Sequence, residues 1–325
     1  MLRSPVAFSL ALATVAIAQD DAWISDFTKA KAQAKADKKD LLVDFTGSDW
    51  CQWCIKLDEE VFSQAAFKTA APKSFVLVKL DFPHDESRVT AEIKAQNEKL
   101  QKELQIGGFP TILLMDAEGR TYAQTGYEPG GADKYIEMLA EMKKKGEVFQ
   151  AAMRSAEGKL GAERAQALDE ALSGIAAEVV SAYHLAPMEE ILKLDADGKA
   201  GLKAKYEPKV KEINDARELR KEADALQAAI GVHMEAGEGD KALAKLEDVI
   251  KAPKSKIQHQ LALFFKGMVI MDTSGDAKSA VAALEAGKAL LPESPVGKRI
   301  DQVLPEIRKQ IDAKKDGGKD EKGGK

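Results

Sequence analysis

The chain has 325 residues, long enough for two domains of ordinary size. Its 48 basic and 53 acidic side chains give a formal net charge of −5, which argues against a nucleic-acid binder because such proteins normally carry a basic face. An apolar content of 45% is ordinary for a globular protein and argues against a chain that crosses a membrane many times.

The first residues predict a cleaved signal peptide over residues 1–18. Arg3 supplies a positive charge, an apolar run follows from Val6 to Ile17, and Ala16-Ile17-Ala18 provides the small residues that a signal peptidase needs. The apolar run is shorter than the roughly 20 residues that span a bilayer. We therefore expect cleavage after Ala18, an exported protein that is periplasmic or secreted, and no stable membrane insertion of the mature chain.

From residue 20 to residue 145, strand and helix patterns alternate. Short apolar runs predict strands, and apolar residues at helical spacing predict helices. We expect a helix whose last part is 30–40, then a strand at 41–45 and a helix over 55–67. A strand at 75–82 and a helix over 87–104 follow. The domain is expected to close with strands at 111–115 and 120–126 and a helix over 132–145. This order predicts an α/β domain in which helices sandwich a central sheet.

Beyond Gly146 the strand patterns vanish, and Ala, Leu, Lys and Glu dominate. The lysines at 143–145 mark the expected boundary, so residues 147–311 are predicted to form an all-α domain. Helical runs are expected over 162–183, 186–194, 198–211, 215–236, 240–250, 257–271 and 276–291. Residues 312–325 contain only Asp, Ala, Lys, Gly and Glu, and we expect them to be disordered.

The helical half contains a loose internal repeat. Gly239-Asp240 and Gly275-Asp276 each lie between two expected helices, and the second copy runs from Phe264 and Gly267 through Ala280 and Leu284 to Pro292. These small residues and the closing proline resemble the tetratricopeptide helix pair, whose repeat is about 34 residues. An unrelated helical bundle is the alternative interpretation.

The chain has only two cysteines, Cys51 and Cys54. A disulfide that closes so small a loop removes little entropy from the unfolded chain, so it would be a poor structural staple. A zinc site usually needs four ligands, and the histidines are scattered singly, at His84, His184, His233 and His259. We expect no metal and no cofactor, which leaves redox chemistry.

The spacing of the two cysteines predicts different roles for them. A Cys-x-x-Cys pair places the first sulfur at the start of a helix, where free amide groups and the helix dipole favour a thiolate. Cys51 is therefore the predicted nucleophile. Cys54, one turn further on, would resolve the mixed disulfide that Cys51 forms with a substrate.

Four segments together resemble the thioredoxin superfamily, in particular its exported branch with Trp-Cys-x-Trp-Cys. They are Leu42–Phe45, which resembles the strand before the active site; Trp50-Cys51-Gln52-Trp53-Cys54, the active site itself; Gly108-Phe109-Pro110-Thr111, the cis-proline loop; and the turn Asp116–Gly119 that follows the next strand. The resemblance covers roughly residues 22–145. It implies a thioredoxin-like domain over 20–145 that carries a Cys51–Cys54 disulfide, followed by the helical-hairpin, tetratricopeptide-like domain.

The resemblance also implies roles for single residues. Pro110 would be cis, and its neighbour Phe109 would expose backbone groups to a substrate chain; a simple turn before a strand is the alternative. Asp44 matches the buried acid that assists proton transfer at the resolving thiol, although one extra residue separates it from the cysteines, and a partly exposed strand residue is the alternative. Trp50 would shape substrate access, and Trp53 either does the same or is ordinary packing.

The function implied is a thiol–disulfide oxidoreductase that acts on exported proteins, with a redox partner supplying or accepting electrons and the helical half presenting a partner surface. Gln52-Trp53 stands where Gly-Pro is more familiar, so reductase, isomerase and oxidase all remain open. One alternative is a binding protein in which the helical array works and the thioredoxin-like domain is a platform. Another is a domain whose disulfide is merely structural.

Overall fold

The structure is a computed structural model that describes residues 22–316. The predicted signal peptide, residues 1–18, lies outside the described residues. The chain divides after Val210 into two compact units. The first unit is the described part up to Val210, and the second unit begins at Lys211.

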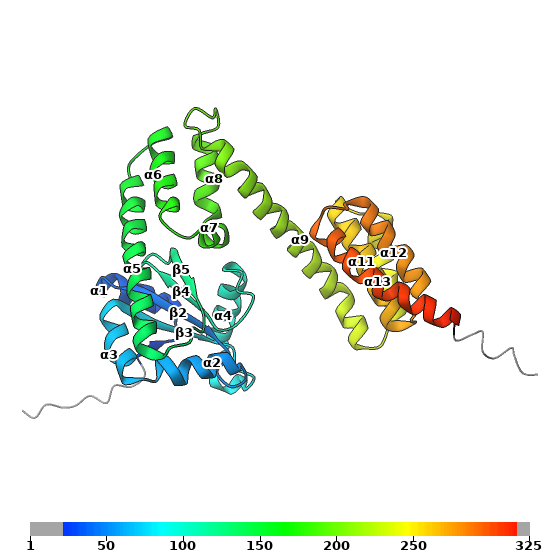
Figure 1. The fold of residues 1–325 in the computed structure, drawn as a ribbon, viewed down its shortest axis with the longest axis horizontal. Coiled ribbons are helices and arrows are strands. Elements are labelled where there is room, and N and C mark those ends of the chain that lie inside the picture. Colours follow the sequence, from blue (N-terminus) through cyan, green and yellow to red (C-terminus); the bar gives the residue numbers. More distant parts are fainter. Residues whose placement is uncertain (1–21, 317–325) are drawn as a thin grey trace, which may run out of the picture. The chain divides into compact units, whose positions relative to one another are not determined.

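The first unit is built around a five-stranded sheet with the order β1-β3-β2-β4-β5. Its strands are β1 (Trp23–Ile24), β2 (Asp40–Thr46), β3 (Phe75–Asp81), β4 (Thr111–Met115) and β5 (Thr121–Thr125). The strands β1, β3 and β2 run parallel, whereas β4 and β5 are antiparallel to their neighbours. Its helical elements begin with α1 (Phe27–Asp37), α2 (Gln52–Leu57), η1 (Asp58–Phe62), α3 (Ala65–Ser74), η2 (Glu86–Arg88), α4 (Ala91–Glu103) and α5 (Gly131–Ala156) (Figure 1).

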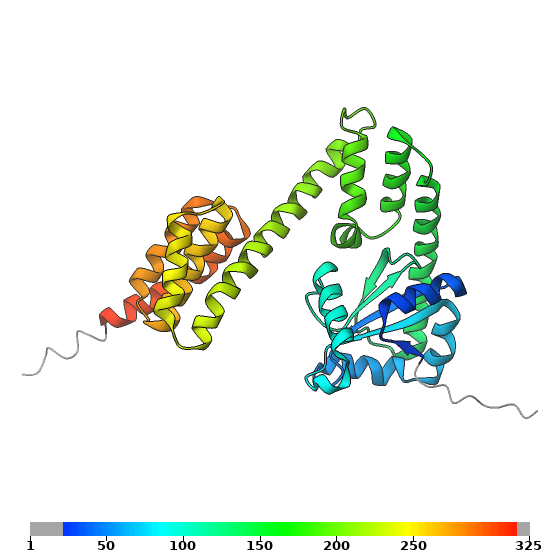
Figure 2. The ribbon, with the colours of Figure 1, turned by 180° about the vertical axis from the view of Figure 1, so that it is seen from behind.

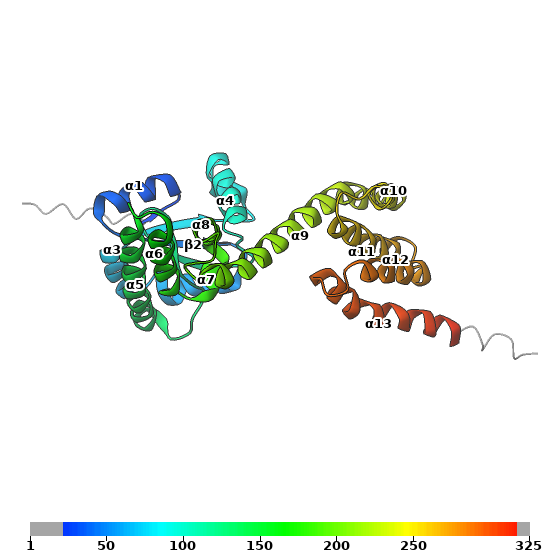
Figure 3. The same cartoon turned by 90° about the horizontal axis from the view of Figure 1, so that it is seen from above.

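The central strand β2 is buried along its whole length. On one face, Leu41, Val43 and Phe45 pack in a core that includes residues of α1. The other face carries Asp40, which bonds to residues of α5. Figure 2 shows α1 in front of the sheet, and Figure 3 shows α1 and α5 on opposite sides of it. This confirms the predicted α/β domain, in which a central sheet is sandwiched by helices.

The helix α5 crosses the predicted boundary at residues 145–147 without a break. Gly146 is buried, and a Cβ there would lie 2.5 Å from Cε2 of Tyr122, so the glycine permits close packing on β5 and does not end the helix. Lys143 Nζ lies 2.9 Å from Asp40 Oδ2, so the lysine run is partly anchored to the sheet. The structure therefore differs from the prediction, because both boundary signals serve contacts within one unit.

Three further helices complete the first unit: α6 (Gly161–Ser173), α7 (Ala177–Tyr183) and α8 (Leu185–Leu194). Tyr183 donates a hydrogen bond to Gln124 Oε1 at 2.7 Å, and His184 Nε2 lies 2.5 Å from the carbonyl oxygen of Thr121. His184 is buried, which lowers the pKa of its imidazole. These contacts attach the first helices of the Ala-rich half to β5, and His184 is a packing residue.

The remaining helices are α9 (Lys203–Glu235), α10 (Gly239–Lys251), α11 (Lys256–Thr273), α12 (Ala277–Leu290) and α13 (Pro295–Asp316). The helices expected over 198–211 and 215–236 are thus one long helix. Its start is held by the buried carboxylate of Asp195, which accepts hydrogen bonds from the backbone amides of Ala200, Leu202 and Lys203 at 2.7–2.9 Å. Within residues 22–316, no helix combines the length and the apolar character needed to span a membrane.

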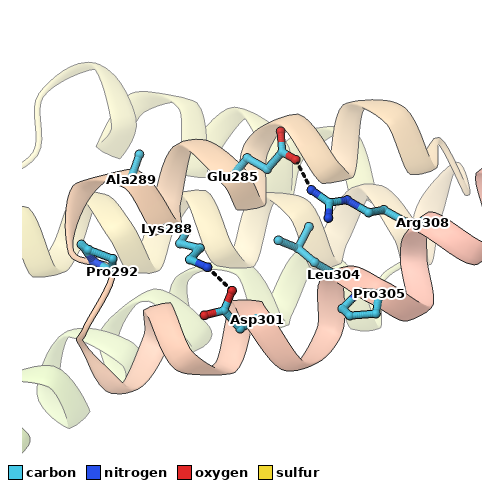
Figure 4. Close-up of a pocket in the computed structure, with 8 residues that line it drawn as sticks. All are labelled: Glu285, Lys288, Ala289, Pro292, Asp301, Leu304, Pro305 and Arg308. Atoms are coloured by element: carbon cyan, nitrogen blue, oxygen red, sulfur yellow. Dashed lines mark hydrogen bonds and ion pairs between the residues drawn. The ribbon is translucent and has the colours of Figure 1, made fainter.

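Successive helices of the second unit pack through small residues. A Cβ at Gly267 of α11 would lie 2.7 Å from Cγ of Leu284 on α12, so these helices approach closely at two of the residues in the predicted repeat. The ion pairs Lys288–Asp301 and Arg308–Glu285 join α12 to α13 and line a groove of about 440 Å³ (Figure 4).

The last helix, α13, was not anticipated from the sequence, although it lies mostly within the predicted all-α region. Val296, Ile300, Leu304 and Ile307 recur at helical spacing and are all buried, which explains why it forms. It continues to Asp316, so the prediction of disorder is wrong for residues 312–316. Ala and Lys, which dominate this stretch, are strong helix formers and extend a helix that packing has already started. Residues 317–325 of the predicted tail lie outside the described residues.

Candidate active site

The two cysteines form a disulfide at the start of α2, with their Cα atoms 5.2 Å apart. Cys51 is the N-cap residue of this helix, and its Sγ accepts a hydrogen bond from the backbone amide of Cys54 at 3.2 Å. In the reduced protein the same amide would stabilise negative charge on Cys51 Sγ, in addition to the effect of the helix dipole. Both residues are more than nine-tenths buried, so little of the pair is exposed to a substrate.

The Phe109–Pro110 peptide bond is cis, as the resemblance implied. The loop before it is fixed by Thr111, whose hydroxyl donates to the carbonyl oxygen of Gly108 at 2.8 Å. The ring of Phe109 stacks on Phe82 with centroids 5.0 Å apart and meets the edge of Trp50 at 5.9 Å. Trp50, the residue before Cys51, therefore contacts the cis-proline loop through the ring of Phe109.

Trp50 is held firmly although 41% of it is exposed. Its Nε1 donates to the carbonyl oxygen of Phe82 at 2.8 Å, and His84 stacks on its ring at 5.2 Å between centroids. A Cβ at Gly47 would lie 2.5 Å from Cε2 of Trp50, so only glycine lets the ring lie this close to the backbone. No local pattern identifies His84 as the partner of Trp50, because it lies on a loop 34 residues further along the chain.

The loop that carries His84 is tied to the active-site turn by carboxylates. Asp49 accepts hydrogen bonds from the backbone amides of His84 and Asp85, both at 2.9 Å. Asp81 accepts from the amide of Ser48 at 2.9 Å and from its hydroxyl at 2.6 Å. The turn before Cys51 is thereby preorganised by contacts to the end of β3 and the loop after it.

Trp53 lies at the surface, with 56% of it exposed. Its ring centroid is 5.1 Å from that of Tyr127, which follows β5. Trp53 thus packs on Tyr127 at the surface and not in the core. Tyr127 was not singled out from the sequence, since no local pattern distinguishes it from a loop tyrosine.

Asp44 lies on β2 with only 2% of it exposed, which rules out a partly exposed strand residue. Its Oδ1 is buried, and no hydrogen-bond partner for this atom is found among the described residues. The β2–β3 register places it opposite Lys79. Burial raises the pKa of the Asp44 carboxyl to about 7; the positive charge of Lys79 opposes this, and the negative charges of Asp58 and Asp81 add to it.

The arrangement offers a Cys51–Cys54 disulfide with an exposed tryptophan next to each cysteine in sequence, Trp50 and Trp53, and the same unit holds the buried acid Asp44. In the described part of the chain, no cluster of three or more His, Cys, Asp or Glu side chains could hold a metal ion. The chemistry available at this place is thiol–disulfide exchange, because the sulfur pair is its reactive element.

Comparison with known proteins bears on the same region. A thioredoxin-like domain family matches residues 27–143. The disulfide bond reductase DsbH of Chlamydia pneumoniae is 36% identical over 114 residues, which cover 35% of this chain and 68% of that protein. The thiol:disulfide interchange protein DsbD of Salmonella paratyphi A is 34% identical over 101 residues, which cover 31% of this chain but only 16% of the relative.

A solved structure of a DsbH oxidoreductase is also similar, with 34% identity over 38% of this chain and 83% of the other and a TM-score of 0.36. The similar proteins are thus thiol–disulfide oxidoreductases of the Dsb type by name, and this chain carries a cysteine pair. Because the match to DsbH covers more than two thirds of that protein, the chain belongs to the thioredoxin-like family.

Proposed function

We propose that the protein is a thiol–disulfide oxidoreductase that reduces disulfide bonds in exported proteins. The observation that carries the proposal is the Cys51–Cys54 disulfide, with Cys51 as the N-cap of α2. Two further observations support it: the cis Phe109–Pro110 bond and the similarity to a protein named as a disulfide bond reductase. The predicted signal peptide, residues 1–18, supports the exported location of the substrates.

The proposed reaction starts from the dithiol form. The Cys51 thiolate attacks one sulfur of the substrate disulfide, that S–S bond breaks, and the departing sulfur leaves as a thiolate and takes up a proton. Cys54 then loses its proton and attacks Cys51 Sγ, which releases the second substrate thiol. The substrate gains two electrons and two protons, and the protein is left with the Cys51–Cys54 disulfide. A dithiol reductant must then return two electrons.

Asp44 is the proposed acceptor of the Cys54 proton. A carboxyl with a pKa of about 7 exists in both protonation states near neutral pH, as a group that takes and returns a proton in one cycle requires. The substrate chain would lie against Trp50, Trp53, Phe109 and the backbone beside Pro110.

We further propose that the second unit binds a protein partner through a tetratricopeptide-like arrangement. What supports this is the close packing of α11 on α12 through Gly267 and Leu284, two of the predicted repeat residues. Arrays of helix pairs present extended surfaces on which peptides dock.

Insulin reduction by the mature chain with dithiothreitol tests the catalytic proposal. We expect Cys51→Ser to fall to the uncatalysed rate, because it removes the nucleophile. We expect Cys54→Ser to accumulate a mixed disulfide, because it removes only the resolving thiol. Leu160→Ala, at a residue that is 82% exposed, is the control and should leave the rate unchanged. A Cys51→Ser variant as fast as the wild type would contradict the proposal.

The direction of the reaction is tested by the redox equilibrium with glutathione. A reductase should have a potential near that of thioredoxin, about −270 mV, whereas a strong oxidant lies near −120 mV. A value near the second figure would overturn reduction as the direction while leaving the dithiol chemistry intact.

A further inference from the structure

The exposed ring of Trp53 is braced by residues from two distant parts of the chain. Lys56 Nζ lies 5.3 Å from the centre of the Trp53 ring and 5.0 Å from the centre of the Tyr127 ring. A cation within about 6 Å of an aromatic ring is attracted to its face. One lysine thus holds both rings, which are themselves 5.1 Å apart.

A second set of contacts closes this cluster. The hydroxyl of Tyr127 donates to Oε2 of Glu60 at 2.7 Å, and Oε1 of Glu60 lies 3.7 Å from Lys56 Nζ. The hydrogen bond with Tyr127 and the charge of Glu60 raise the pKa of the Lys56 ammonium. Lys56 and Glu60 therefore neutralise each other, and the surface that the cluster offers is chiefly aromatic.

The cluster is continuous with the cis-proline loop. A Cβ at Gly126 would lie 3.1 Å from the carbonyl oxygen of Pro110, so the residue before Tyr127 packs directly on that loop. The hydroxyl of Tyr135 donates to the carbonyl oxygen of Gly126 at 3.0 Å and fixes this segment to α5. Trp53 itself lies between the two cysteines in sequence. The cluster is thus joined both to the Cys-x-x-Cys segment and to the cis-proline loop.

We propose that Trp53, Tyr127, Lys56 and Glu60 form an aromatic wall that selects substrates with a large apolar side chain next to the reacting cysteine. The occupant is an extended segment of the substrate polypeptide, since the reaction itself brings that chain to Cys51. The inference rests on the proposed disulfide reduction and adds a substrate class to it. Tyr127, Lys56 and Glu60 act as positioning residues, because they hold the ring of Trp53 where the side chain docks.

Three disulfides test the wall. Two are disulfide-linked dimers of a short peptide that contains one cysteine. In one peptide Phe flanks the cysteine, in the other Ser does, and the two peptides carry the same net charge. The third, hydroxyethyl disulfide, has no side chain to dock. We expect kcat/KM for the Phe peptide to exceed that for the Ser peptide by about tenfold, in line with a pair of well-packed aromatic groups. The small disulfide serves as the reference for the thiol chemistry.

Tyr127→Ala is the principal variant, because it lies outside the Cys-x-x-Cys segment. It should lose most of the preference for Phe, measured as the ratio of kcat/KM for the Phe peptide to kcat/KM for the Ser peptide, and should leave the redox potential unchanged. Tyr127→Phe keeps the ring but not the hydrogen bond to Glu60, so it should keep part of the preference. Trp53→Ala should remove the preference entirely, and Leu160→Ala should keep it.

Two results would overturn the wall and leave disulfide reduction standing. One is a wild-type protein that reduces all three disulfides but does not distinguish the Phe from the Ser peptide. The other is a Tyr127→Ala variant that slows all three substrates by the same factor, which would mean a structural role. A wild-type protein that reduces none of the three would instead refute the proposed reduction, and the wall with it.

Discussion

Two buried aspartates lie four residues apart on β2, and their surroundings differ. The carboxylate of Asp40 accepts hydrogen bonds from the Tyr122 hydroxyl and Lys143 Nζ, each at 2.9 Å, and from Gln150 Nε2 at 3.1 Å. Asp44 is equally buried, yet its Oδ1 has no hydrogen-bond partner among the described residues. Asp40 is thus paired with a cation and hydrogen-bonded, whereas Oδ1 of Asp44 is buried without a hydrogen bond from the described residues.

The difference separates a structural acid from a chemical one. The oxygens of Asp40 are shared among a cation and two further donors, and these contacts attach α5 to the central strand β2. A buried carboxyl without such partners favours its neutral form, so its pKa rises into the range where it can exchange a proton. The comparison therefore predicts opposite responses to substitution at the two ends of β2.

The largest expected effect is at Asp44. Its pKa is about 7 in the folded protein against an ordinary value of 3.8, so the folded state binds more protons than the unfolded chain between about pH 4 and pH 7. The free energy of unfolding therefore falls as pH rises through that window and stays low above it. Asp44→Asn should remove this fall and raise the free energy of unfolding at pH 8 by on the order of 4 kcal/mol, at about 1.4 kcal/mol per pKa unit.

Urea unfolding of the oxidised protein at pH 4.5 and pH 8 measures this effect. All three tryptophans lie in the first unit, so their fluorescence reports on that unit. Asp40→Asn is the matched control, and it should lower stability at both pH values because it leaves Lys143 without its partner. Equal stability of the wild type at both pH values would refute the proposed state of Asp44.

The next effect concerns the cation beside Asp40. Lys143→Met should lower the free energy of unfolding by about 2–3 kcal/mol, somewhat less than for a fully buried pair because 24% of the Lys143 side chain is exposed. Lys144→Met is the control: this neighbour is 69% exposed and pairs only with Glu141 on the surface, so its loss should cost less than about 0.5 kcal/mol. Equal effects at the two positions would show that Asp40 does not need Lys143.

The smallest effect tests how closely α5 approaches the sheet at this end. Gly146→Ala brings a Cβ against the ring of Tyr122, and overpacking of this kind costs about 1–3 kcal/mol. Gly107→Ala places its Cβ in open space and should change stability little. Thermal unfolding followed by tryptophan fluorescence compares the two variants, and a Gly146→Ala protein as stable as the wild type would mean that α5 shifts freely on β5.

Much of the first unit was predictable because its signals are local. The run at 41–45, apolar except for Asp44, matches the central strand, and the cysteine spacing matches a nucleophile at a helix start. The cis Phe109–Pro110 bond followed from the resemblance, since an isolated X-Pro bond is trans in most cases. In the Ala-rich half the helical character was evident from the sequence. The prediction nevertheless joined α6 and α7 into one helix, divided α9 into two, and did not include α13.

The sequence by itself therefore determined the elements of the catalytic domain and the reactive pair, because alternation, spacing and capping act over a few residues. Only the tertiary structure decided which buried acid is paired, since the partners of Asp40 lie 82 to 110 residues away in the chain. It also decided that α5 continues past Gly146, and that Tyr127 reaches Glu60 across 67 residues. Contacts of this range depend on how strands and helices are placed in space, and no local pattern encodes that placement.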